Sequence, residues 1–585
     1  MPWAHCRPLQ KPLQWSAPLA LVLLSACAQD PLQEAPAIAA DAGRSAAITE
    51  SSETDSAVET PIPDHSLLPL LQAEFALRAR DYPQGLDLLS QQAMVLTDPA
   101  VARRALSLAE FMENPPVAMA MAIRLADLDP TDGPAAAAAS QWLARSNEQV
   151  LALEYAGKAL ALGSEVNIAA NLANYQRWDE ATRQQIAAEI THLAHQWPSD
   201  DQVAMAASLL ARLQKRFNDA EAILEPVLER SPEDVRALLL WTQLKMDQKH
   251  SDPLSRLEQA VASYPDNASL RLQFARLLGA EQEFAQARQQ FAILLEQDPD
   301  NPELLMTAAL LDYEMNLFDP ALVLFKRLID LDNRADEAHY YVGRIESARD
   351  RYDEAIAAFA AVGPSEQFTD AKVRAVSLLE ETGFLADIQA FFDGQRRRFP
   401  SAAEQLFLLE AESLKEWPGE RMSTYDRGLI AFPNSFSLLY GRAMVYESAG
   451  AIDAMERDLR TILAEDPNHA ATLNALGYSL TNRTQRYDEA RELIERALVL
   501  EPDDPAILDS LGWVYFKLGQ LPQSEALLRR AHQAFPDPEV AAHLGEVLWV
   551  LGREFEARDI WQDGLSRAPE HPIILEAMMR LGAAP

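Results

Sequence analysis

The chain has 585 residues, more than one compact core normally supports, and only 21 are glycine, so most of it is expected to form packed elements. Its 88 acidic and 51 basic residues leave a formal net charge of −37, which argues against nucleic acid as a partner because phosphate binding needs concentrated Lys and Arg. The same charge disfavours contact between the folded body and anionic membranes.

Residues 1–26 have the pattern of an export signal. Arg7 and Lys11 form a short positive region, and the apolar run at 17–24 is too short to span a bilayer. The sequence Leu-Ser-Ala-Cys that ends at Cys27 resembles the lipobox of bacterial lipoproteins. The resemblance implies cleavage before Cys27 and acylation of that residue. The alternative is an ordinary signal peptide in which Cys27 is incidental.

The residues that follow are expected to be a tether. Residues 27–64 consist mainly of Ala, Pro, Ser, Thr and acidic residues, with Arg44 as the single basic residue, and this composition predicts disorder. Lipoproteins that lack aspartate after the cysteine pass to the outer membrane, and Ala28 stands there. The resemblance therefore implies a lipid anchor in the outer membrane facing the periplasm. The other cysteine, Cys6, lies in the predicted signal, so no intrachain disulfide is expected.

From residue 65 to 569 the chain repeats itself about every 34 residues. Joints recur from Pro99 to Pro569 at intervals of 31 to 36 residues, and prolines mark most of them. A period in this range is typical of a solenoid built from helical pairs. The sequence therefore predicts an all-α fold.

The clearest repeats lie in residues 470–569. A Leu-Gly pair ends at Gly477, Gly512 and Gly545, and Ala490 is one of the small residues on the following helix. This pattern resembles the tetratricopeptide repeat. The resemblance implies a right-handed superhelix of about 15 helix-turn-helix repeats over residues 65–569, with each glycine where the two helices of a pair come closest.

Two stretches keep the spacing but lose most of the signature, and we interpret them as degenerate repeats. They are residues 165–198 and 365–433. After the last repeat, residues 570–585 are expected to contain a helix that caps the array, because solenoids need covered ends. The alternative is a docking edge for a partner.

No catalytic motif stands out, and we expect no enzyme activity, cofactor or metal site. His192 and His195 could share a helix face, but no further metal ligand is close in sequence. The basic triplet at 396–398 is interpreted as a solvated helix face, with a contact for an acidic partner as the alternative.

A protein-binding surface is the predicted functional feature. In tetratricopeptide arrays the first helix of each pair lines the concave face, and the resemblance assigns aromatic and polar residues to it. The positions are Asn474, Tyr478, Asp509, Trp513, Phe516 and Trp549, with Tyr340 and Arg344 further upstream. Such a wall could form a peptide groove, because aromatic side chains provide large contact areas at low entropy cost. The alternative is that these residues pack against neighbouring helices.

The combination of lipobox, acidic tether and repeats resembles the outer-membrane lipoproteins that partner a periplasmic carboxyl-terminal-processing protease. That resemblance implies a scaffold or adaptor that recruits the protease and presents cell-wall hydrolases to it. The alternative function is an assembly factor for an envelope machine, such as a pilus secretin or a polysaccharide exporter. An enzyme with a site in residues 365–433 is disfavoured, because no catalytic groups converge there.

Overall fold

The computed structural model describes residues 62–382 and 385–583. The predicted signal peptide, Cys27 and the tether up to residue 61 lie outside these ranges. The described residues form thirty α-helices and three short 3-10 helices, without a strand, which confirms the all-α fold of repeated helical pairs. No helix in these ranges is long and apolar enough to cross a membrane.

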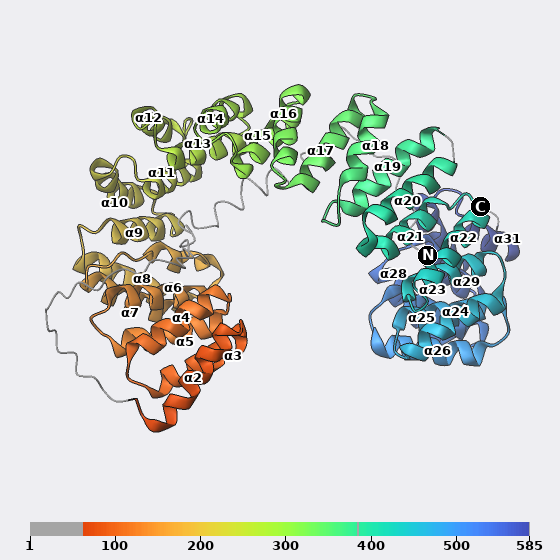
Figure 1. Ribbon diagram of the computed structural model, residues 1–585. Helices are drawn as coiled ribbons and strands as arrows, with labels where there is room; N and C mark the ends of the chain where they lie inside the picture. The colour runs from red at the N-terminus through yellow and green to blue at the C-terminus, as the bar shows by residue number, and fades with distance from the viewer. Residues whose placement is uncertain (1–61, 383–384, 584–585) are drawn as a thin grey trace. The chain divides into compact units, whose positions relative to one another are not determined.

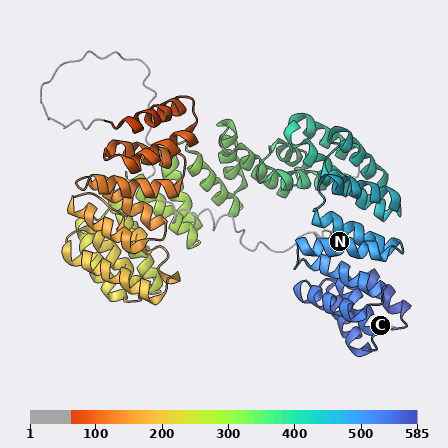
Figure 2. The ribbon, with the colours of Figure 1, turned by 90° about the horizontal axis from the view of Figure 1, so that it is seen from below.

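The chain divides into two compact units, Met1–Met315 and Asn316–Pro585. Within each unit, consecutive helices pack on one another (Figures 1 and 2). The described elements of the first unit are α2 (Asp64–Arg78), α3 (Tyr82–Val95), α4 (Pro99–Phe111), α5 (Pro115–Leu128), α6 (Gly133–Arg145), α7 (Gln149–Ala161), η1 (Ile168–Leu172), η2 (Tyr175–Arg177), α8 (Glu180–Gln196), α9 (Asp201–Leu213), α10 (Phe217–Arg230), α11 (Val235–Asp247), α12 (Ser255–Ser263), α13 (Ala268–Ala280), α14 (Phe284–Gln297) and α15 (Pro302–Glu314).

The second unit begins with α16 and ends with α31. Its elements are α16 (Phe318–Asp330), α17 (Ala335–Ala348), α18 (Tyr352–Ala361), α19 (Phe368–Thr382), α20 (Leu385–Arg398), η3 (Pro400–Ala402), α21 (Ala403–Ser413), α22 (Pro418–Ala431), α23 (Phe436–Ser448), α24 (Ile452–Glu465), α25 (Ala470–Arg483), α26 (Tyr487–Leu500), α27 (Pro505–Lys517), α28 (Leu521–Ala534), α29 (Pro538–Val550), α30 (Glu554–Arg567) and α31 (Pro572–Arg580).

Local sequence explains where the helices of the regular repeats begin and how they pair. Asp504 caps α27 by accepting a hydrogen bond from the backbone N–H of Ile507 at 2.9 Å, and a proline occupies the first helical position. A Cβ on Gly512 would lie 2.7 Å from Leu528 Cγ on α28, and one on Gly545 would overlap the Trp561 ring on α30. Glycine therefore allows the close approach of each pair.

The two degenerate stretches depart from this pattern in different ways. In residues 165–198 the short 3-10 helices η1 and η2 stand where a first helix would be, and α8 follows. Just before the second stretch, residues 365–433, helix α18 has only ten residues, compared with 14 in α26. Lys372 on α19 is fully buried and donates hydrogen bonds to three carbonyl oxygens at the end of α18, those of Phe359, Ala360 and Val362, at 3.0, 3.2 and 2.7 Å. Its amino group therefore caps a shortened helix.

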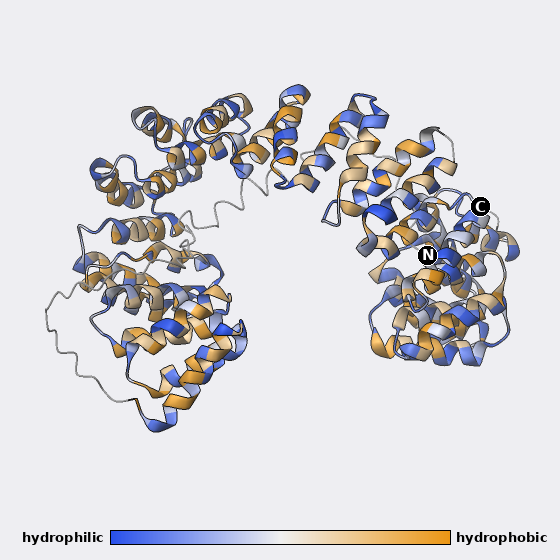
Figure 3. Ribbon diagram, viewed as in Figure 1, coloured by the Kyte–Doolittle hydropathy of each residue, from blue (hydrophilic) through white to orange (hydrophobic). Residues whose placement is uncertain are grey.

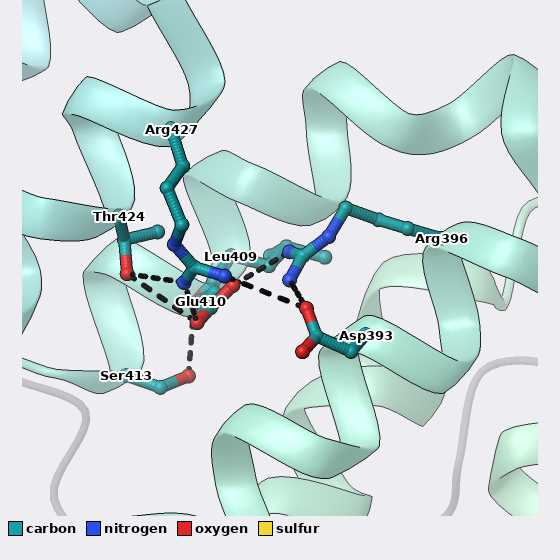
Figure 4. Close-up of polar contacts among 7 residues, drawn as sticks. All are labelled: Asp393, Arg396, Leu409, Glu410, Ser413, Thr424 and Arg427. Atoms are coloured by element: carbon teal, nitrogen blue, oxygen red, sulfur yellow. Dashed lines mark hydrogen bonds and ion pairs between the residues drawn. The ribbon is translucent and has the colours of Figure 1, made fainter. Parts of the chain in front are cut away.

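A buried ionic cluster joins α20, α21 and α22 (Figure 4). Glu410 is fully buried, and its carboxylate accepts hydrogen bonds from Arg396 and Arg427, each at 2.6 Å. Asp393 also accepts from both arginines. The side chain of Arg396 is only 10% exposed. The prediction of a solvated face for residues 396–398 is therefore wrong at Arg396, because the Glu410 carboxylate of the neighbouring helix and the Asp393 carboxylate of its own helix draw its guanidinium inward.

The position of Glu410 within its helix explains why this repeat looks degenerate. Glu410 lies eight residues after Ala402, the N-cap of α21. Gly477, Gly512 and Gly545 stand at the same distance from the N-caps of α25, α27 and α29. A carboxylate thus occupies the position that the regular repeats give to glycine, and two arginines compensate its charge.

The last helix, α31, packs on α29 and α30. Ala577 is buried, and Ile574 and Met578 are buried in a core that includes Trp561. At the end of α31, Arg580 binds the carboxylate of the buried Glu546 through two hydrogen bonds of 2.6 and 2.7 Å. Apolar burial and one bidentate ion pair therefore hold α31 on the final repeat.

Candidate protein-binding surface

Helices α25, α27 and α29 are the first helices of the three most regular repeats. Neighbouring members of this set contact each other, whereas α26, α28 and α30 make no comparable contact with one another in the described structure. The first helices are therefore the more closely spaced layer. We call the layer of side chains that Tyr478, Asp509, Trp513, His543 and Trp549 form on these helices, with their immediate neighbours, the inner wall; Asp509, Trp513 and His543 are buried in it.

A hydrogen-bonded network runs across the inner wall. The Tyr478 hydroxyl on α25 donates a hydrogen bond to the Glu539 carboxylate on α29. His543, which also lies on α29, is 4% exposed. Its Nδ1 lies 3.0 Å from both carboxylate oxygens of Asp509 on α27. The network thus links all three first helices.

Trp513 stacks inside this network. Its ring centroid lies 4.1 Å from that of His543, with an interplanar angle of 19°, and 5.0 Å from that of Phe516. Its Nε1 donates a hydrogen bond to Asn482 Oδ1 at 2.8 Å. Trp513 is only 5% exposed, so most of its surface contacts the protein itself.

Burial and nearby carboxylates control the protonation of the network. Burial, followed by the charges of Glu539 and Asp509, raises the pKa of Tyr478, so the hydroxyl keeps its proton and remains a donor. Burial opposes a charge on His543, but the Asp509 carboxylate, together with the charges of Glu539 and Glu546, raises the pKa of the imidazole above its ordinary value. Protonated His543 then compensates part of the negative charge around it.

A more accessible aromatic edge borders the network. Phe516, Lys517 and Trp549 are each half-buried. The Lys517 ammonium lies 4.3 Å from the Trp513 ring centroid, and the Arg558 guanidinium lies 4.7 Å from that of Trp549. Burial is the main cause that lowers the pKa of Lys517. This edge therefore combines exposed ring area with cations, which suits peptide side chains and carboxylates.

The remaining predicted positions lie in two places. Asn474 is half-buried on α25. Tyr340 and Arg344 lie on α17, where the Tyr340 hydroxyl donates to Asp370 Oδ2 on α19 at 2.5 Å, and Arg374 donates to the same oxygen at 2.6 Å. Arg344 lies 5.9 Å from the Tyr340 ring centroid. Burial, with the hydrogen bond to Asp370, raises the pKa of Tyr340.

Repeat reasoning did not identify His543, Glu539 or Lys517. His543 stands two residues before Gly545. The preceding repeats have Ala475 and Ser510 at this position, so the repeat pattern gave no reason to expect a functional residue there. Glu539 lies in the first turn of α29 and reads as an ordinary helix-start acid. Only the spatial proximity of α25 to α29 shows that Glu539 meets Tyr478.

Comparisons with known proteins agree with the helical pairs. Family models described as tetratricopeptide repeat match residues 249–311, 306–367, 440–505 and 482–547. TPR repeat-containing protein PA4667 of Pseudomonas aeruginosa is 34% identical over 503 residues, which cover 84% of this chain and 85% of that protein. Bacteriophage adsorption protein A of Escherichia coli is 34% identical over 88 residues, 15% of this chain and 9% of that protein.

Among solved structures, a thermophilic TPR protein from Thermus thermophilus is 22% identical. The match covers 31% of this chain and 98% of that chain, with a TM-score of 0.28. The relative in Pseudomonas aeruginosa resembles this chain over most of both lengths, and the repeat models match in both units. The chain therefore belongs to the tetratricopeptide-repeat family.

Proposed function

We propose that the protein is a lipid-anchored scaffold of the outer membrane, facing the periplasm, which binds other proteins through its repeat helices. In this proposal it recruits a carboxyl-terminal-processing protease and presents cell-wall hydrolases to it. The observation that carries the binding role is the aromatic edge of the inner wall, where Phe516, Lys517 and Trp549 are half-buried. The lipobox that ends at Cys27 supports the location.

The edge suits a peptide segment for physical reasons. The rings of Phe516 and Trp549 already have neighbours that hold them in place, so a ligand would order few additional bonds. Lys517 and Arg558 lie over these rings and would meet carboxylates of the bound segment. Trp513 and His543 would support the edge from beneath rather than contact the ligand.

Affinity capture with crosslinking from envelope extracts tests the proposal. We expect the wild type to recover a processing protease together with cell-wall hydrolases. The double variant Phe516→Ala/Trp549→Ala should lose at least part of this set. Phe555→Ala is the matched control, because Phe555 is 87% exposed on α30, a second helix.

Two outcomes would contradict the proposal. Recovery of secretin or polysaccharide-export subunits instead of the protease would favour the assembly-factor function. Equal recovery by the double variant and the wild type would show that the binding surface does not include the inner wall. The anchor has an independent test, since the intact mass of the mature protein should include acyl groups on Cys27, and an unmodified soluble product would refute it.

A further inference from the structure

The first helix of the array, α2, leaves an apolar face uncovered. Leu67, Leu68, Leu71 and Phe75 are 50, 63, 47 and 66% exposed, and the α2 ribbon is largely orange in Figure 3. The last repeat carries α31 on its corresponding end, whereas no described helix precedes α2. Four large apolar side chains on one exposed helix are more than scattered surface residues, and such a face marks an interaction surface.

The residues of this face are arranged symmetrically along the helix. Asp64, Leu67, Leu71, Phe75 and Arg78 follow one another at intervals of three or four residues, so they share one face. Leu71 is the middle residue of the helix that runs from Asp64 to Arg78. The acidic end and the basic end are therefore equally distant from a central leucine.

We propose that α2 is the binding site for α2 of a second copy of this chain, in antiparallel pairing about a two-fold axis at Leu71. Reversing the helix about Leu71 places Leu67 opposite Phe75 of the second copy. It also places Asp64 opposite Arg78 of the second copy, and the symmetry repeats each contact. Antiparallel helices also align their dipoles favourably.

Charge complementarity favours a second copy over an unrelated partner. Both exposed ends of α2 find an opposite charge when the helix meets its own reverse, and Leu71 meets an identical leucine. Glu74 is occupied elsewhere, because it forms an ion pair with Arg104 on α4. Glu74 therefore does not place an uncompensated negative charge against Leu68 of the second copy.

The area that this pairing would bury is small, and this limits the affinity of the dimer. A single helix on each side buries less than the roughly 800 Å² per partner of a typical stable complex. The pairing is accordingly expected in the micromolar range in solution. Anchoring two copies to one membrane would raise their effective concentration and strengthen the pairing. The pairing itself does not depend on the proposed recruitment of a protease.

Sedimentation velocity over a range of concentrations tests the pairing. The protein used is the whole chain without residues 1–26 and with Cys27→Ser, so that lipid does not cause association. We expect a reversible dimer. Leu71→Glu should weaken it about 100-fold or more, because two carboxylates would meet at the axis. Val323→Glu is the matched control, since Val323 is 67% exposed on α16, and this variant should pair like the wild type.

A charge exchange tests the antiparallel register. Asp64→Arg and Arg78→Asp should each weaken the dimer several-fold, and the double variant should recover the wild-type affinity. Leu71→Cys in the same background should form a disulfide-linked dimer under oxidation, whereas Val323→Cys should not. A chain that stays monomeric at high micromolar concentration, or a dimer that Leu71→Glu leaves unchanged, would overturn the proposal. Circular dichroism establishes that each variant is folded.

Discussion

Two regions of the second unit build the same helical pairs from different interiors. In α25–α30, glycine on the first helix admits Leu528 or Trp561 from the second, and the interface is apolar. In α19–α22 buried polar groups stand instead, since Lys372 of α19 caps α18 and Glu410 of α21, in the position of the glycine, is held by two arginines. The pair geometry therefore tolerates an ionic interior, provided that every buried charge finds partners.

Removing one partner from the buried ionic cluster is expected to have the largest effect on the free energy of unfolding. Arg396→Met removes one of the two guanidinium partners of the fully buried Glu410, and we expect a loss of about 3–5 kcal/mol in the free energy of unfolding. Denaturant unfolding measures the loss, and hydrogen exchange in α20–α22 assigns it to this region. The triple variant Glu410→Leu/Arg396→Met/Arg427→Met should be much less destabilised. A stable single variant would show that the ionic cluster does not hold the region.

From the burial of Lys372 we predict that the region around α18 and α19 gains stability as pH rises. Burial lowers its pKa to about 7, while a lysine in the unfolded chain titrates near ~10.4. Between these values the unfolded state binds more protons, so the free energy of unfolding should rise with pH by up to ~1.4 kcal/mol per pH unit, and this dependence should end below about pH 7, where both states are protonated. Lys372→Met should abolish this slope in urea unfolding curves. An unchanged slope would contradict the expectation.

A pair of glycine substitutions compares a closely packed glycine of the regular repeats with an open one in α20. Gly545→Ala places a methyl group against Trp561, and we expect a loss of about 1–3 kcal/mol. Gly394 in α20 has open space around it, so Gly394→Ala should gain about 0.5–1 kcal/mol from helix propensity. Thermal unfolding measures both. Equal effects at the two sites would show that glycine is not a packing requirement in the regular repeats.

The smallest expected effect is a pH dependence of opposite sign in the regular repeats. The pKa of His543 is raised, so its contribution is complete below about pH 6.5 and is lost as pH rises through the folded value. We expect less than ~1.4 kcal/mol per pH unit. His543→Gln should flatten this decrease and leave the Lys372 slope intact. A variant that still loses stability over this range would assign the effect to another group.

The sequence predicted the features that repeat and missed those that occur once. The offsets of Gly477, Gly512 and Gly545 identified the helical pairs because close packing requires small residues at a fixed period. The burial of Lys372 and Glu410 could not be predicted in this way, because the sequence does not distinguish a buried charged residue from a solvated one. That Glu410 takes the position of the repeat glycine became visible only once the structure gave the N-cap of α21.

The inner wall was predicted only as a set of positions. The repeat pattern assigned Trp513 and Tyr478 to the concave face. It could not show that Trp513 stacks on His543 or that Tyr478 donates a hydrogen bond to Glu539. These contacts depend on the spacing of three helices, which a one-repeat pattern does not contain. Whether the wall binds a partner stays a prediction.

The hydrogen bond from Tyr478 to Glu539 has a consequence for how this end of the chain unfolds. Its two residues are 61 positions apart, so it joins helices two repeats distant. In a solenoid, cooperativity normally arises from coupling between adjacent repeats alone. A link that skips α27 adds second-neighbour coupling, so α25–α30 should open as a single cooperative block instead of fraying one repeat at a time from the terminus.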